Sequence, residues 1–184
     1  EKIKLFGNLK HNIVSTGSLK KSKDYITLIN AVNFLINKNI EINLNIIGEG
    51  EEKENLDKLI KKNNLSQNIK LLGYIKDPFP YLVNADLYVN SSIYDGLPLS
   101  MIEALVSKVP IVSTDCDSGP REILRNGKYG ILVPIKDYKL LAFEIENVLT
   151  KKKSIGKVTE EDKLLYDSKA ISKKYINFFF NKLN

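Results

Sequence analysis

The 184-residue sequence has only one cysteine, Cys116, which excludes an intrachain disulfide and a zinc site built from several cysteines. Its longest uncharged apolar run is far shorter than the roughly 18 residues that a membrane-spanning helix needs. It shows no charged leader followed by an apolar stretch, the pattern that marks a secreted protein. These absences predict a cytoplasmic protein in a reducing environment.

Arginine is also scarce, since Arg121 and Arg125 are the only arginines among 28 basic residues. The lysines give a net charge of +6, and apart from the run 151–153 they are scattered along the chain. Nucleic-acid-binding proteins tend to gather arginines and aromatic residues on one face. We therefore expect no nucleic-acid partner, while weak peripheral contact with the anionic inner face of the plasma membrane fits the lysine excess.

With 43% hydrophobic and 27% charged residues, the composition is that of a globular domain. Short apolar segments alternate with amphipathic ones along most of the chain. Strands are expected at Ile13–Thr16, Ile42–Ile47, Ile69–Leu72, Leu87–Asn90, Ile111–Ser113 and Ile131–Val133. Because these segments are almost continuously Ile, Val and Leu, we expect strands buried on both faces, as in a parallel sheet.

Helices are expected at Asp24–Asn37, Glu51–Asn63, Pro80–Asn84, Leu99–Ser107, Pro120–Arg125 and Asp137–Leu149. The alternation predicts a Rossmann-like α/β fold, a doubly wound parallel six-stranded sheet with helices on both faces. A polar stretch from residue 151 and an amphipathic pattern over about 160–182 predict a linker and a C-terminal helix.

Ligands of such sheets bind beyond the carboxyl ends of the strands. After the fourth expected strand, Gly96 and Pro98 lead into a helix whose first amides are free to bind an anion, and Asp95 and Glu103 lie on either side of that helix start. Carboxylates accept hydrogen bonds from sugar hydroxyls, so this loop fits a nucleotide sugar. The same pattern also fits a turn residue at Asp95 and a solvated helix position at Glu103.

Other segments carry weaker signals. The turn Gly17–Asp24 suits a phosphate next to Lys23, and it equally suits surface lysines. Asp115 and Asp117 form a D-x-D pattern, which suits a divalent cation in some transferases and also arises by chance. Gly48-Glu49-Gly50 lacks the third glycine of a dinucleotide fingerprint and predicts a tight turn. His11, before the first expected strand, is interpreted as a surface residue.

Several motifs in order resemble the C-terminal, donor-binding half of family 4 (group 1) retaining glycosyltransferases with the GT-B fold. The most specific motif runs from Tyr94 to Leu105 and is similar to that family's E-x7-E element, followed by a buried strand after Val109-Pro110. The resemblance covers roughly residues 13–149. It implies residues 13–150 as the donor-binding domain, 1–12 as the remnant of an interdomain linker, and 151–184 as the linker and C-terminal helix.

The resemblance also implies roles for individual residues. Glu103 matches the carboxylate that binds the ribose, Asp95 the one that contacts the transferred sugar, and Lys23 the lysine that neutralises the departing diphosphate. Lys23 and Asp95 are thus the expected catalytic residues. The whole implied donor site consists of Gly17, Ser18, Lys23, Ile75, Asp95, Gly96, Leu97, Pro98, Leu99, Ser100 and Glu103.

Two departures from the family pattern matter for this site. Asp95 is one methylene shorter than the usual Glu, which affects its reach toward the sugar. Ser18 stands where an Arg commonly joins the lysine on the diphosphate, and Lys20, Lys21 or Arg121 are candidates to compensate.

The activity implied is transfer of a hexose, from a UDP-hexose, to a glycan or lipid-linked acceptor with retention and without a metal cofactor. Such chemistry serves bacterial polysaccharide assembly, as in lipopolysaccharide or capsule. The acceptor site would lie in an N-terminal domain for which this chain has no room, so the chain alone is expected to be inactive. Two alternatives stay open, a non-catalytic nucleotide-binding module and a metal-dependent transferase using Asp115 and Asp117.

Overall fold

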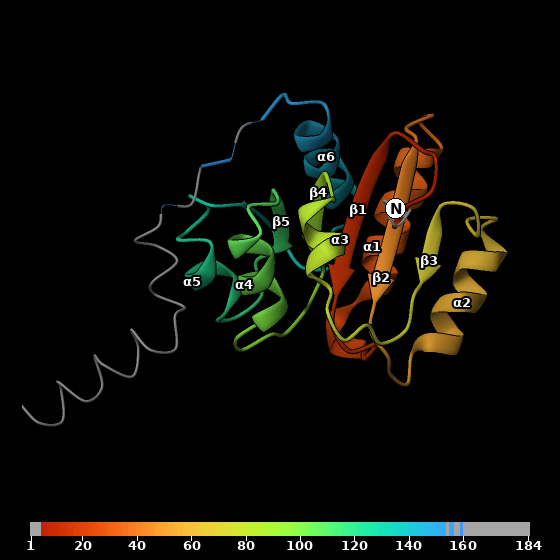
Figure 1. Ribbon diagram of the computed structural model, residues 1–184, viewed down its shortest axis with the longest axis horizontal. Helices are drawn as coiled ribbons and strands as arrows, with labels where there is room; N and C mark the ends of the chain where they lie inside the picture. The colour runs from red at the N-terminus through yellow and green to blue at the C-terminus, as the bar shows by residue number, and fades with distance from the viewer. Residues whose placement is uncertain (1–4, 154, 157–158, 160–184) are drawn as a thin grey trace, which may run out of the picture.

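Six parallel strands form one sheet in the order β3-β2-β1-β4-β5-β6 in the computed structural model of the protein, which describes residues 5–153, 155–156 and 159 (Figure 1). The strands are β1 (His11–Thr16), β2 (Ile42–Ile47), β3 (Ile69–Leu71), β4 (Leu87–Asn90), β5 (Ile111–Thr114) and β6 (Ile131–Val133). This doubly wound sheet confirms the predicted fold class. The strand order reverses between β1 and β4, and such sheets bind their ligands at that switch point.

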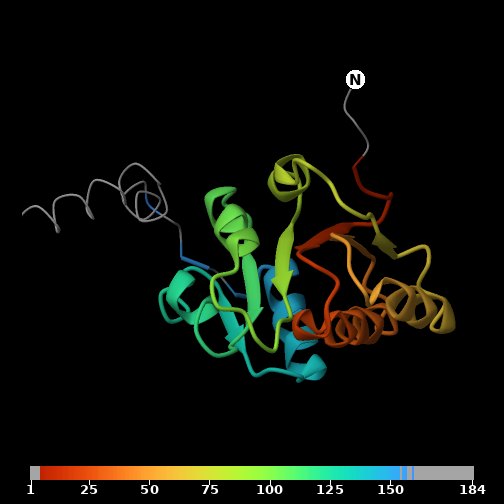
Figure 2. The same ribbon diagram turned by 90° about the horizontal axis from the view of Figure 1, so that it is seen from below.

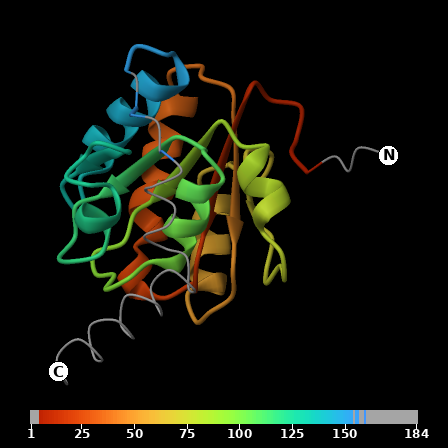
Figure 3. The ribbon, with the colours of Figure 1, turned by 60° about the vertical axis from the view of Figure 1, so that its left-hand side comes forward.

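Helices cover both faces of the sheet, as Figure 2 shows from below. One face carries α1 (Tyr25–Ile36), α2 (Lys53–Lys62) and α6 (Tyr138–Leu149), and α1 and α6 lie side by side on it (Figure 3). The other face carries the shorter helices α3 (Phe79–Val83), α4 (Leu99–Val106) and α5 (Pro120–Ile123). All six correspond to predicted helices, with ends that shift by up to two residues.

Side chains alternate between the two faces of each strand and so feed two separate hydrophobic cores. Ile13 of β1 and Leu44 of β2 are fully buried in the core beneath α1 and α6. Val14 and Tyr88 point into the opposite core, where they join Met101 of α4. The second core therefore supports the helix that follows β4, which is the helix at the predicted site.

A short 3-10 turn, Lys21–Lys23, precedes α1 and was not predicted from the sequence. Asp24 follows it in the left-handed region, with a φ of 43°, and caps α1. Its carboxylate accepts hydrogen bonds from the amide of Thr27 at 3.3 Å and from the Thr27 hydroxyl at 2.7 Å. The cap fixes the start of α1 and thereby the direction in which Lys23 leaves the backbone.

The first strand begins at His11, two residues earlier than predicted, and the amide of His11 donates to the carbonyl of Glu41 at 3.0 Å. His11 is therefore a half-buried residue of β1, whereas the sequence predicted a surface residue before that strand. The C-terminal helix predicted over residues 160–182 lies outside the described residues. Within the described part of the chain, no helix combines the length and apolar character that crossing a membrane requires.

Candidate functional site

The chain leaves β1 through Gly17, and glycines of the next loop support this turn. Gly48 and Gly50 have φ angles of 146° and 159°, and a Cβ on either would collide with the backbone of Gly17 or Leu19. The amide of Leu19 also donates to the carbonyl of Glu49 at 2.8 Å. The glycines after β2 thus permit two backbones to approach each other, which agrees with the predicted tight turn.

Three lysines follow in the turn after β1. Lys20 and Lys21 are exposed, and the amide of Lys20 donates back to the carbonyl of Ser18 at 2.9 Å. Lys23 differs from both, because its side chain is only 17% exposed. Of the three lysines, Lys23 is therefore the one that turns inward, and it is the lysine that the family resemblance assigns to the diphosphate.

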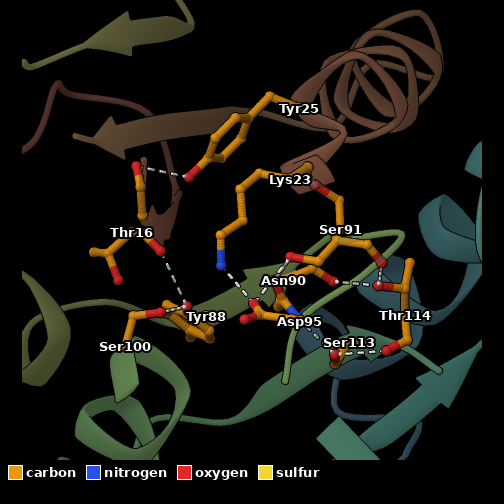
Figure 4. Close-up of polar contacts among 12 residues, drawn as sticks. Thr16, Lys23, Tyr25, Tyr88, Asn90, Ser91, Asp95, Ser100, Ser113 and Thr114 are labelled. Carbon is orange, nitrogen blue, oxygen red and sulfur yellow. Dashed lines mark hydrogen bonds and ion pairs between the residues drawn. The ribbon is translucent and has the colours of Figure 1, made fainter. Parts of the chain in front are cut away.

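Lys23 and Asp95 form an ion pair across the switch point, with Lys23 Nζ 2.5 Å from Asp95 Oδ2 (Figure 4). Two further hydrogen bonds join their loops. Ser91 Oγ donates to the carbonyl of Lys23 at 2.8 Å, and the amide of Ile93 donates to the carbonyl of Ser22 at 2.8 Å. The structure thus brings together the two residues predicted to be catalytic, although they are 72 positions apart.

A buried polar network at the ends of β4 and β5 supports Asp95 from below (Figure 4). The fully buried Ser92 hydroxyl lies 2.7 Å from Asn90 Oδ1 and 3.2 Å from Asp95 Oδ2. Asn90 Nδ2 donates to Ser113 Oγ at 3.2 Å, and Thr114 Oγ1 donates to the carbonyl of Ser92 at 2.5 Å. The sequence analysis did not predict this network. The pattern that could have indicated it is the polar residues at the ends of β4 and β5, two strands that are otherwise mostly apolar.

The loop after β5 holds the Asp95 loop from the other side. The amide of Gly119 donates to the carbonyl of Gly96 at 3.0 Å. A Cβ on Gly119 would lie only 2.5 Å from Pro98 Cδ and 2.6 Å from the carbonyl oxygen of Asp95. A Cβ on Gly96 would meet nothing within 4 Å, and the φ of Gly96 is not in the left-handed region. Glycine at position 96 therefore keeps a space open above the loop.

Helix α4 presents its amino end beside Asp95. It starts at Leu99, after the buried Pro98, and no side chain caps it. The amides of Leu99 and Ser100 have no hydrogen-bond acceptor among the described residues. Leu97 and Leu99 are 59% and 66% exposed, so they leave this end open to solvent. Free amides and the positive end of the helix dipole favour an anion here.

Two buried tyrosines form the scaffold beneath these loops. The Tyr88 hydroxyl lies 3.1 Å from Ser100 Oγ and 3.5 Å from the carbonyl oxygen of Thr16. The Tyr25 hydroxyl donates to the carbonyl of Gly17 at 3.2 Å. Burial raises the pKa of Tyr88 and of Tyr25 above the ordinary value, so both stay neutral and act as hydrogen-bonding supports. Thr16 Oγ1 is buried without a hydrogen-bond partner among the described residues.

Glu103 lies in the second turn of α4, and its side chain is largely exposed. Partial burial raises its pKa above the ordinary value, and the nearby Asp77 carboxylate raises it further. Asp77 Oδ1 accepts the amide of Phe79 at 3.1 Å at the start of α3. Ile75 packs against the core that contains Met101 of α4. Glu103 thus lies on α4 near Asp77, which was not predicted, and Ile75 packs against the core on the same side of the sheet.

The alternative metal site has a different environment. The Asp115 carboxylate pairs with Arg121, whose Nε donates to Asp115 Oδ1 at 3.1 Å, while Asp117 is exposed. Both aspartates line a cavity of about 580 Å³ together with Cys116, whose thiol pKa is raised chiefly by burial. In residues 5–153, 155–156 and 159, no three His, Cys, Asp or Glu side chains are grouped to hold a metal ion. Arg121 is therefore engaged at Asp115.

Comparison with known proteins places this chain in a family. A family model described as "Glycosyl transferases group 1" matches residues 2–164. An uncharacterized glycosyltransferase of Methanocaldococcus jannaschii is 40% identical over 65% of this chain and 32% of its own length. The N-acetylgalactosamine-N,N'-diacetylbacillosaminyl-diphospho-undecaprenol 4-alpha-N-acetylgalactosaminyltransferase of Campylobacter jejuni is 32% identical over 86% of this chain and 40% of its length. The poly(ribitol-phosphate) alpha-N-acetylglucosaminyltransferase of Staphylococcus aureus is 33% identical over 83% of this chain and 32% of its own length. The chain thus spans about a third to two fifths of the length of these relatives.

Solved structures agree with this result. A mutant of S. aureus TarM in complex with fondaparinux, alpha-GlcNAc-glycerol and UDP matches 92% of this chain with a TM-score of 0.80 and 27% identity, and the match covers 35% of that protein. The C-terminal domain of a Francisella tularensis group 1 glycosyl transferase (LpcC) has the same fold, with a TM-score of 0.69 and 24% identity. The match covers 90% of this chain and 86% of that domain. The chain belongs to the glycosyl transferase group 1 family, and it has the fold of the C-terminal domain of retaining GT-B enzymes.

Proposed function

We propose that this chain is the donor-binding half of a retaining glycosyltransferase, which transfers a hexose from a UDP-hexose to a glycan or lipid-linked acceptor. The observation that carries the proposal is the Lys23–Asp95 pair beside the free amides of α4. A cation and amides suit a diphosphate, and a carboxylate beside them suits the sugar hydroxyls. The TarM mutant complexed with UDP supports the choice of nucleotide.

The roles follow the order of groups in a nucleotide sugar. Glu103 would accept hydrogen bonds from the ribose hydroxyls, and the backbone near Ile75 would meet the base. The amides of Leu99 and Ser100 would bind the phosphates together with Lys23. Asp95 would contact the hexose, for which the open space above Gly96 leaves room.

Transfer requires the diphosphate to leave as the bond to the anomeric carbon breaks. Negative charge would then grow on the phosphate oxygens, and Lys23 and the α4 amides would stabilise it. The sugar would pass through an oxocarbenium-like transition state, and the acceptor oxygen would attack from the side that the diphosphate leaves. Because a lysine and helix amides supply the neutralising charge, we expect no divalent cation to be needed.

The acceptor would be held by the half of the enzyme that lies outside this chain, so the chain alone is expected to bind the donor without turning it over. The relatives from C. jejuni and S. aureus, whose names specify a diphospho-undecaprenol-linked glycan and a poly(ribitol-phosphate), support a lipid-linked or polymeric acceptor. We expect the enzyme to work at the inner face of the plasma membrane, on the cytoplasmic side.

Isothermal titration calorimetry tests the proposal with UDP, GDP and ADP, each with EDTA and with Mn²⁺. We expect UDP to bind in EDTA, and Glu103→Ala to weaken binding at least tenfold. Glu54→Ala, which changes a glutamate in the first turn of α2, is the matched control and should leave the affinity unchanged. Binding that requires Mn²⁺ and is lost in Asp115→Ala would instead favour the metal-dependent alternative.

A further inference from the structure

If the proposed function holds, Lys23 interacts with two anionic groups, the Asp95 carboxylate and the diphosphate of the donor. Its ammonium group is bonded to Asp95 Oδ2 in the structure. A bound diphosphate would compete for the same ammonium group, so the bond from Lys23 to Asp95 would weaken when the donor arrives. The Asp95 side chain is only 12% exposed, so solvent cannot fully replace that partner. Another hydrogen-bond donor from the protein would compensate the carboxylate whenever no sugar hydroxyl reaches it, as with UDP or pyrophosphate.

Ser92 is placed to be that donor. Its hydroxyl has a single proton and two acceptors within reach, Asn90 Oδ1 at 2.7 Å and Asp95 Oδ2 at 3.2 Å. Asn90 Oδ1 is the nearer of the two acceptors, and Asp95 Oδ2 is at the same time bonded to Lys23. We propose that Ser92 is a positioning residue, whose hydroxyl turns from Asn90 to Asp95 when the diphosphate takes Lys23 away. This inference rests on the proposed function.

The surroundings of Ser92 allow this turn without moving the backbone. Thr114 Oγ1 holds the carbonyl of Ser92 at 2.5 Å, and Asn90 is itself anchored through its amide to Ser113 Oγ. Ser92 is fully buried, so its hydroxyl has no solvent partner that could compete. A rotation about one side-chain bond is then enough to exchange the acceptor, and Asp95 keeps its place for the incoming hexose.

The exchange predicts two opposite effects on diphosphate binding. Asp95→Ala removes the competitor for Lys23 and a negative charge near the phosphates, so UDP and inorganic pyrophosphate should bind about three- to tenfold more tightly. Ser92→Ala keeps the Lys23–Asp95 pair but removes the replacement donor, so both ligands should bind about tenfold more weakly. In the double variant Asp95→Ala/Ser92→Ala, the second substitution should have no further effect on affinity.

The test is a double-mutant cycle on the full chain, with pyrophosphate and UDP affinities measured by calorimetry. Ser92→Thr keeps the hydroxyl and should restore most of the affinity lost in Ser92→Ala. Thr150→Ala is the control, because it removes a hydroxyl that donates to the Glu146 carbonyl at the end of α6, outside the predicted site. It should leave both affinities within about twofold of the wild type.

The outcomes separate this inference from the proposed function. Ser92→Ala losses of equal size with and without Asp95 would show a merely structural role and overturn the exchange, while nucleotide binding by the wild type would stand. Pyrophosphate binding with the expected coupling, but without any preference for UDP, would support the exchange and overturn the proposed nucleotide. A wild-type chain that binds neither ligand would overturn both.

Discussion

Gly119 offers a sharp test of how the site is held together. In Gly119→Ala, the new Cβ would lie 2.5 Å from Pro98 Cδ, 2.6 Å from the carbonyl oxygen of Asp95 and 2.7 Å from that of Gly96. Ordinary contact begins near 3.4 Å, so the Asp95 loop would have to move by about 0.7–0.9 Å. All three atoms belong to backbone or a proline ring, and none can rotate away.

The cost follows from these contacts. Overpacking of this kind destabilises a protein by about 1–3 kcal/mol. The movement also strains the hydrogen bond from the Gly119 amide to the Gly96 carbonyl, which contributes about 1 kcal/mol. We therefore expect Gly119→Ala to lower the free energy of unfolding by about 2–4 kcal/mol and Tm by roughly 5–15 °C for a chain of this size. The displaced loop should also weaken UDP binding.

Gly96→Ala makes the same chemical change with the opposite expectation. Nothing lies within 4 Å of its Cβ, so its free energy of unfolding should stay within about 0.5 kcal/mol of the wild type. Its methyl group would occupy the space above the loop and weaken binding of a UDP-hexose such as UDP-glucose. Urea denaturation and calorimetry measure both quantities. A Tm for Gly119→Ala within 2 °C of the wild type would refute the reasoning.

Further predictions concern single side chains of the site. Glu103→Gln should raise Tm at pH 7, because the raised pKa of Glu103 means that its charged form destabilises the fold; the gain should vanish as the pH falls below the ordinary glutamate pKa of about 4.3. Thr114→Val removes the hydrogen bond to the Ser92 carbonyl and should cost about 1–2 kcal/mol of unfolding free energy in urea, whereas Thr114→Ser should not. Lys23→Met should weaken UDP binding at least tenfold by calorimetry, and Lys21→Met, at an exposed lysine of the same turn, by no more than about twofold.

Most of the fold could be predicted because its signals are local. Continuous Ile, Val and Leu runs identify buried parallel strands, and β2, β4 and β6 have the predicted bounds. The Asp24 cap is readable because its partner Thr27 is three residues away. The 3-10 turn at Lys21–Lys23 was missed because one short turn has no periodicity. The first two residues of β1, His11 and Asn12, were missed because they are polar and pair at the rim of the sheet.

The site could be predicted only in part. Family resemblance pointed to Lys23, Asp95 and Glu103, and the structure pairs the first two. The order of motifs in the sequence does not reveal that Lys23 bonds to Asp95, since that contact depends on how β1 and β4 lie next to each other. The Ser92 network could not be predicted for the same reason, because its bonds cross between two strands. The roles of these residues in binding remain predictions for the experiments above.

The seam between β1 and β4 has a consequence for how the two halves of the sheet stay together. Six residue pairs join β1 to β2, while only Ile13–Leu87 and Val14–Tyr88 join β1 to β4. A donor bound by Lys23 on one side and by Glu103 on the other would contact both halves of the sheet and so connect them across the β1–β4 boundary. If the chain were cut after Asn84, the fragments on either side of the cut would each carry part of the site. Because α1 and α6 also pack across the cut, a bound nucleotide would add to their contact, and its concentration would shift the fraction of fragments that are joined.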